Sequence, residues 1–298
     1  MEKHSLSTSQ HQLGSFRTYV QGLVEKFQPL QLFCFAKSKT SIETSGCFTN
    51  QQDNYQCDYS LLMVTASNAR VDHEVQDFTN THYFQGTIAI ICHGQETILE
   101  AIRANNRFFM TVCSSGQLLY SHNGMIQVDY NGNFIPTQSG KKALRHFNHR
   151  MPLAEGFLHG AAECLSKQDF SVSTFMLHQV AEQCCILLIR VQLAYRSEVH
   201  SISRLLRLCT SFSERPIKMF LSGCPEDERL FDILQKSYSG SRYKDNFKVS
   251  EKDARSLFDR VSRYVDMVKE MCVTKIEELE YEAVLYKELH GESEVQID

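Results

Sequence analysis

The sequence predicts an α+β protein in which an α/β domain is followed by a domain that contains only helices. Up to residue 122, short apolar runs of the length of buried strands alternate with segments of helical periodicity. After residue 140, the apolar residues repeat with the helical period. Residues 123–140 are rich in Gly and Asn, which favours exposed turns. We therefore expect an α/β domain at residues 10–122, a linker at 123–140 and a helical domain at 141–298.

The first domain is expected to begin with a helix. Apolar residues recur at helical spacing from Gln12 to Phe27, and Pro29 then ends the pattern. The elements predicted after it are strands at 30–36, 59–65 and 87–92, a polar loop at 37–56, helices at 71–84 and 96–105, and an edge strand at 118–121.

The second domain is expected to be a helical bundle, with helices at residues 143–166, 170–194, 202–211, 226–239 and 251–289. The helix at 170–194 is the most informative, because it is strongly apolar and yet carries His178 and Glu182. Polar groups of this kind are costly to bury unless they have partners. The sequence therefore indicates a special role for this helix.

Composition limits the possible functions. The chain has 298 residues, of which 42% are hydrophobic and 22% charged, as in soluble globular proteins. The net charge of −4 gives no general attraction to a phosphate backbone, so a nucleic-acid site must be a local patch, and no pattern points to DNA. The 11 scattered cysteines indicate reduced thiols, and no segment has the apolar core of a secretory signal or approaches a membrane-spanning length. A cytoplasmic protein without a membrane partner is expected.

Four segments of the second half follow one another in a characteristic order. They are the helix around Phe157 to Leu165, the LHQVAEQ run at 177–183, the YRSEVHSISRLLRLC run at 195–209, and SRYKDNF at 241–247. In this order they resemble the HEPN domain family. The resemblance covers roughly residues 150–270. It implies an all-α bundle that binds nucleotides or RNA, and that forms a homodimer with its cleft at or near the interface.

Arg196 and His200 are the candidate catalytic residues. Ribonucleases that the HEPN family includes carry an arginine and a histidine separated by four to six residues, whereas here only Ser197, Glu198 and Val199 intervene. A histidine can act as a general base toward a ribose 2′-hydroxyl while an arginine stabilises the phosphate charge, without a metal. His200 also has a structural alternative, as a hydrogen-bonded linker before the next helix.

Further residues are candidates for nucleotide binding near the same end of the bundle. His178 and Glu182 are four apart on one helix face, as are Arg196 and His200 if that helix continues. Arginine and lysine beside a tyrosine suit a phosphate and a base. The alternative is a solvated helix face with ordinary ion pairs. The nucleotide-binding candidates are His178, Glu182, Arg204, Arg242, Tyr243 and Lys244.

The first half has the predicted order helix, strand, long loop, strand, helix, strand. This order resembles that of a degenerate nucleotidyltransferase-like domain of the minimal type. That family has Gly-Ser after the first strand and an Asp-x-Asp on the next, which holds metal ions. Here the first strand reads LFCFAKS, and the second has Asp58 in the first acidic position but Ser60 in the second. A hydroxyl does not supply the missing charge. Asp58 is thus a candidate metal ligand or a strand-entry residue, and nucleotide transfer is not expected.

His146 and His149 are spaced to share a metal, but no third ligand has suitable spacing. No cofactor is therefore expected. The sequence predicts a nucleotide- or RNA-binding protein whose partner is a nucleotide or RNA. Two alternatives stay open, a metal-independent ribonuclease that uses Arg196 and His200 and a non-enzymatic dimeric scaffold or regulatory partner.

Overall fold

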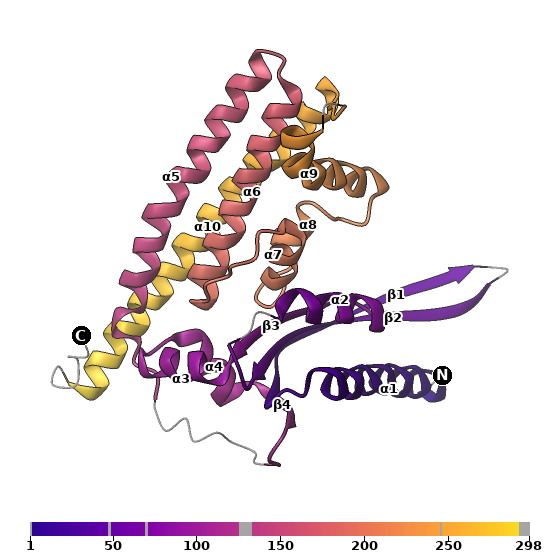
Figure 1. The fold of residues 1–298 in the computed structure, drawn as a ribbon, viewed down its shortest axis with the longest axis vertical. Coiled ribbons are helices and arrows are strands. Elements are labelled where there is room, and N and C mark those ends of the chain that lie inside the picture. The colour runs from indigo at the N-terminus through magenta and orange to yellow at the C-terminus, as the bar shows by residue number, and fades with distance from the viewer. Residues whose placement is uncertain (1, 47–48, 69–70, 125–132, 245, 292–298) are drawn as a thin grey trace. The chain divides into compact units, whose positions relative to one another are not determined.

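A computed structural model describes residues 2–46, 49–68, 71–124, 133–244 and 246–291. The chain divides into two compact units, Met1–Phe134 and Ile135–Asp298 (Figure 1). The first combines a sheet with helices and the second is helical, which confirms the predicted α+β fold.

The first unit contains a mixed four-stranded sheet in the order β3-β2-β1-β4. Its strands are β1 (Gln31–Gly46), β2 (Thr49–Thr65), β3 (Ile88–Gly94) and β4 (Gln117–Ser121). The β1 strand pairs antiparallel with β2 and with β4, and β2 pairs parallel with β3.

The predicted polar loop at 37–56 was wrong. Both strands continue through this region as a long hairpin, with pairing from Lys37 and Tyr59 as far as Gly46 and Thr49. A two-stranded ribbon does not need a buried face, so its strands can be polar on both sides and lack the alternation that marks a half-buried strand.

Helices cover the sheet of the first unit. They are α1 (Glu2–Phe27), α2 (Asp72–His82), α3 (Gln95–Arg103) and α4 (Arg107–Ser115). Tyr19 and Leu23 of α1 and Phe78 of α2 share one core cluster with Leu61 and Met63 of β2. The sequence did not predict α4, which begins where the Asn106 side chain accepts hydrogen bonds from the first backbone N–H groups.

The described residues of the second unit form a short 3₁₀ turn, η1 (Pro136–Gln138), and six α-helices. These are α5 (Ser139–Ser166), α6 (Phe170–Leu193), α7 (Ile202–Cys209), α8 (Arg215–Lys218), α9 (Pro225–Tyr243) and α10 (Glu251–His290). The three long helices α5, α6 and α10 lie side by side (Figure 1). By length and composition α6 could cross a membrane, but 67% of its most apolar window is buried inside the structure, as in a core helix.

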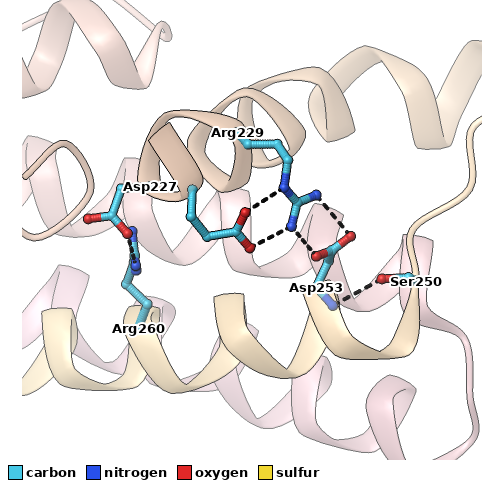
Figure 2. A network of polar contacts seen from close by, with 6 residues as sticks. Asp227, Arg229, Ser250, Asp253 and Arg260 are labelled. Carbon is cyan, nitrogen blue, oxygen red and sulfur yellow. Dashed lines mark hydrogen bonds and ion pairs between the residues drawn. The ribbon is translucent and has the colours of Figure 1, made fainter. Parts of the chain in front are cut away.

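Ion pairs join α9 to α10 (Figure 2). Arg229 lies between two carboxylates, with nitrogen–oxygen distances of 2.7 Å to Glu226 and 2.5 Å to Asp253. Arg260 pairs with Asp227. Each of these arginines therefore has a carboxylate partner that neutralises its positive charge.

Candidate anion-binding site

Two arginines lie between α5 and α6. These two long helices are joined by a short connection at residues 167–169, so they run antiparallel. Side chains on the facing sides of α5 and α6 therefore contact each other. Arg150 donates to the Gln183 side chain at 2.5 Å, and Arg190 donates through Nε to His146 Nε2 at 3.1 Å. Both partners are acceptors without negative charge.

A third arginine approaches the same place from the segment that follows α6. That helix ends at Leu193 because Ala194 adopts a left-handed conformation, with φ 59° and its N–H bonded to the Arg190 carbonyl. Burial and the nearby Arg196 charge lower the pKa of Arg150, and burial, Arg196 and Arg150 lower the pKa of Arg190. The three guanidinium groups are therefore close enough to repel one another, and we call them the arginine cluster.

The arginine cluster differs from the paired arginines of Figure 2. Within the described ranges of the chain, none of Arg150, Arg190 and Arg196 forms an ion pair with a carboxylate. The charge of Glu182 acts on Arg150 without a direct ion pair. Because none of the three guanidinium groups is paired directly with a carboxylate among the described residues, an external anion can neutralise their charge.

Glu182 connects the cluster to two histidines. Its Oε1 lies 2.9 Å from His200 Nδ1, and its Oε2 lies 3.9 Å from His178 Nδ1. The Glu182 side chain is only 6% exposed, whereas that of His200 is 73% exposed. A buried carboxylate therefore orients an exposed imidazole through Nδ1, which leaves Nε2 free to face solvent.

Aromatic and basic side chains continue from His178 along α9. The His178 ring lies 5.0 Å from the Tyr238 ring. The Arg242 guanidinium stacks over Tyr238 at 4.0 Å and lies 5.0 Å from the centre of the exposed Tyr243 ring. These residues form a partly exposed aromatic platform, defined here as Tyr238, Arg242 and Tyr243.

The environment keeps two of the histidines uncharged. Burial lowers the pKa of His178 to about 4, and the Arg242 charge adds to the effect. Burial and then the charges of Arg190 and Arg150 lower the pKa of His146 to about 4. At neutral pH the positive charge of this region is therefore carried by its arginines.

We expect the stability of the protein to fall as pH decreases from about 6.5 to about 4. The pKa of His178 is about 4 in the folded chain, against about 6.5 for an ordinary histidine in the unfolded chain. In that window the unfolded chain therefore binds more protons, and folding becomes less favourable. Urea unfolding at about pH 7 and about pH 4.5 measures the difference, to which His178 contributes on the order of 2 kcal/mol.

The His178→Gln variant should lose most of that contribution, whereas His159→Gln, an exposed histidine of α5, should keep it. The same fall in stability for the native chain and for His178→Gln would contradict this assignment.

The structure brings together several of the residues predicted from sequence. His178, Glu182 and His200 are linked directly, and Arg242 and Tyr243 join them through Tyr238. Arg196 and His200 would share a helix face only if the helix continued through them, and this condition is not met, because α6 ends at Leu193. Arg204 lies half-buried in the first turn of α7, and Lys244 is exposed at the end of α9.

Sequence reasoning missed the arginine cluster itself. Neither Arg150 nor Arg190 was a candidate from the sequence, and His146 was a candidate only as one of two residues that could share a metal. His146 Nε2 instead accepts a hydrogen bond from Arg190. The sequence did contain a signal for this cluster. His146 and Arg150 are four residues apart and therefore lie on one face of α5, and Gln183 and Arg190 share the face of α6 that they contact.

Asp58 has a local structural partner in the first unit. Its Oδ1 accepts hydrogen bonds from the backbone N–H of Thr87 at 2.6 Å and from the Thr87 hydroxyl at 2.8 Å. These bonds fix the start of β3 beside β2. Among the described residues, no group of three or more His, Cys, Asp or Glu side chains is arranged to hold a metal ion.

Comparisons with known proteins identify part of the helical unit. The HEPN domain family model matches residues 149–271. A search of curated proteins finds no significant match.

Two solved structures are also similar to parts of this chain. An archaeal HEPN homologue is 23% identical, covers 42% of this chain and 96% of its own, and has a TM-score of 0.32. A nucleotidyltransferase-like protein from Exiguobacterium sibiricum 255-15 is 9% identical, covers 91% of this chain and 80% of its own, and has a TM-score of 0.29. Both scores are too low to support an assignment by themselves. The family model places a HEPN domain at residues 149–271 of this chain, within its helical unit.

Proposed function

We propose that the helical unit binds single-stranded RNA or a nucleotide through its phosphate groups, at the arginine cluster. The observation that carries this proposal is the gathering of Arg150, Arg190 and Arg196, whose direct hydrogen-bond acceptors in the described structure are a neutral amide and a neutral imidazole. Guanidinium groups match phosphate oxygens in geometry, and a site that already holds them in place requires little rearrangement on binding.

The aromatic platform supports a nucleotide or RNA as the ligand in preference to a simple anion. Tyr243 is 75% exposed, and the Arg242 guanidinium lies 4.0 Å from the centre of the Tyr238 ring and 5.0 Å from that of the Tyr243 ring. A nucleobase can stack on such a surface whatever its sequence. His178 and Glu182 link the aromatic platform to the neighbourhood of Arg150. A base and a phosphate of the same RNA strand or nucleotide can therefore be bound together.

Fluorescence anisotropy with a labelled single-stranded RNA of about ten nucleotides tests the proposal. We expect saturable binding at low salt that weakens as salt is added, because phosphate contacts release counterions. Competition with adenosine monophosphate distinguishes a nucleotide site from one that needs a longer strand. If no RNA binds at low salt and the nucleotide does not raise the melting temperature, the proposal is wrong.

RNA cleavage is a second candidate function, supported by one specific observation. His200 is bonded through Nδ1 to a buried carboxylate and exposes its other nitrogen beside the arginine cluster. This arrangement fits a general base that removes the proton of a ribose 2′-hydroxyl, with Arg196 stabilising the charge on the phosphate. The same hydrogen bond also ties the connection after α6 back to that helix, which agrees with the structural alternative.

We also propose that the chain forms a homodimer through its helical unit. Apolar side chains are exposed on one face near the end of α10, namely Tyr281, Val284, Leu285 and Leu289. Exposed apolar patches of this kind favour association. Light scattering should give twice the monomer mass of 34.3 kDa, and a monomer at all concentrations would contradict the dimer. A dimer that binds no RNA or nucleotide would instead support the scaffold alternative.

Nucleotide transfer by the first unit is disfavoured. Ser60 stands where a second carboxylate is needed, and Asp58 is bonded to Thr87. We infer that this unit does not transfer nucleotides, and magnesium-dependent incorporation of labelled ATP that is lost in Asp58→Ala would overturn this.

A further inference from the structure

A cavity in the first unit is separate from the site proposed in the helical unit. It has a volume of about 250 Å³ and lies between α1, β1, β2 and β4. Phe16, Val20 and Leu119 form its apolar part. The Phe16 ring stacks face to face on Tyr59, with centroids 3.9 Å apart and an interplanar angle of 12°, and both aromatic rings line the cavity.

An irregularity in β1 brings a cation to this cavity. Cys34 pairs with Leu61 but Ala36 pairs with Ser60, so Phe35 is an extra residue, as in a β-bulge. Side chains alternate along a strand, and the extra residue therefore places both Cys34 and Lys37 on the side covered by α1. Both line the cavity, and Lys37 Nζ lies 5.4 Å from the centre of the Tyr59 ring.

The cavity is on the opposite face of the sheet from Asp58 and Ser60. These two residues flank Tyr59 in β2, so their side chains point away from the cavity that Tyr59 lines. It is therefore distinct from the position in which nucleotidyltransferases carry their carboxylates.

The cations at the cavity have no negative counterpart in its lining. Arg17 and Lys37 are exposed, and the described residues around the cavity include no Asp or Glu. The volume is at the small end for ligand pockets, which suits a single ring better than a polyphosphate.

We propose that this cavity binds a small organic anion with a flat apolar body. The ring lies against Phe16 and Tyr59, and the charged group pairs with Arg17 and Lys37 at the opening. Carboxylates and phosphate monoesters share this chemistry.

Ligand-observed NMR on the full chain tests the proposal, with phenyl phosphate and benzoate as anionic probes and benzyl alcohol as the uncharged probe. Both anions should bind more tightly than the alcohol. The anion with the lower Kd shows whether the cavity prefers a phosphate or a carboxylate. Lys37→Met should raise the Kd of the preferred anion about ten-fold. Lys39→Met, which removes the same charge from the same strand without lining the cavity, should not.

A second variant separates occupation of the cavity from a simple charge effect. Leu119→Trp fills the apolar part without changing charge and should abolish ring binding, while the melting temperature shows whether the chain is folded. Binding of phosphate at the arginine cluster should be unchanged in these variants, which distinguishes failure of this proposal from failure of the proposed function. Equal Kd values for the native chain, Lys37→Met and Leu119→Trp, or equal binding of benzyl alcohol, would overturn the proposal.

Discussion

The double variant Arg150→Gln/Arg190→Gln is expected to bind single-stranded RNA about 100-fold more weakly than the native chain. Each guanidinium supplies a charge-assisted contact to phosphate, and such a contact is worth about 1.5 kcal/mol, or about ten-fold in affinity. Glutamine keeps a polar side chain of similar reach but has no charge. Fluorescence anisotropy with labelled RNA at one fixed low salt concentration measures the loss.

Arg263→Gln is the matched control for that variant. Arg263 is exposed on α10, and its Nε donates to the carbonyl of Asp259 within the same helix. It should change RNA affinity by less than about two-fold. Circular dichroism must show that the double variant is folded. An equal loss in the double variant and in the control, or no loss in either, would mean that RNA does not bind at the arginine cluster.

His200→Ala is expected to abolish RNA cleavage, with a fall in rate of at least about 100-fold, if the helical unit is a ribonuclease. The size follows from the usual contribution of a general base. RNA affinity should stay within about three-fold of the native value, because His200 is outside the arginine cluster. Gel analysis of a mixed RNA pool with an excess of chelator measures cleavage without a metal.

Two further variants separate catalysis from structure. His149→Ala removes an exposed histidine of α5 and should leave cleavage unchanged. Glu182→Gln should reduce cleavage and change its pH profile, since it removes the carboxylate that orients His200. Cleavage that survives in His200→Ala, or its absence from the native chain at high protein concentration, would leave His200 with the structural role alone.

The sequence predicted the long helices of the second unit because burial imposes a regular apolar period over many turns. The helix expected at 170–194 is observed as Phe170–Leu193, and that expected at 251–289 as Glu251–His290. The hairpin at 37–56 and the four-residue helix α8 were not predicted. Helix α8 is too short, and the sequence of the hairpin too polar, to produce an apolar repeat that sequence analysis can detect.

The candidate site was predicted only in part, because some of its contacts join residues that are far apart in the sequence. His178 and Glu182 are four residues apart on one helix, a relation that the sequence shows directly. Arg190 and His146 are 44 positions apart, and Arg150 and Gln183 are 33 apart. Such contacts depend on how α5 and α6 align, which no local pattern determines. The left-handed conformation of Ala194 is likewise unexpected for a residue with a side chain, and it determines where Arg196 lies.

The salt dependence of RNA binding tests the arginine cluster most directly, because it counts the phosphate contacts that disappear with named residues. For single-stranded RNA, the slope of log K against log salt is about −0.7 for each phosphate contact. We predict that the slope of Arg150→Gln/Arg190→Gln is smaller in magnitude than the native slope by about 1.4, and that Arg263→Gln retains the native slope. A native slope in the double variant would show that these arginines do not contact phosphate, and would contradict the proposed function.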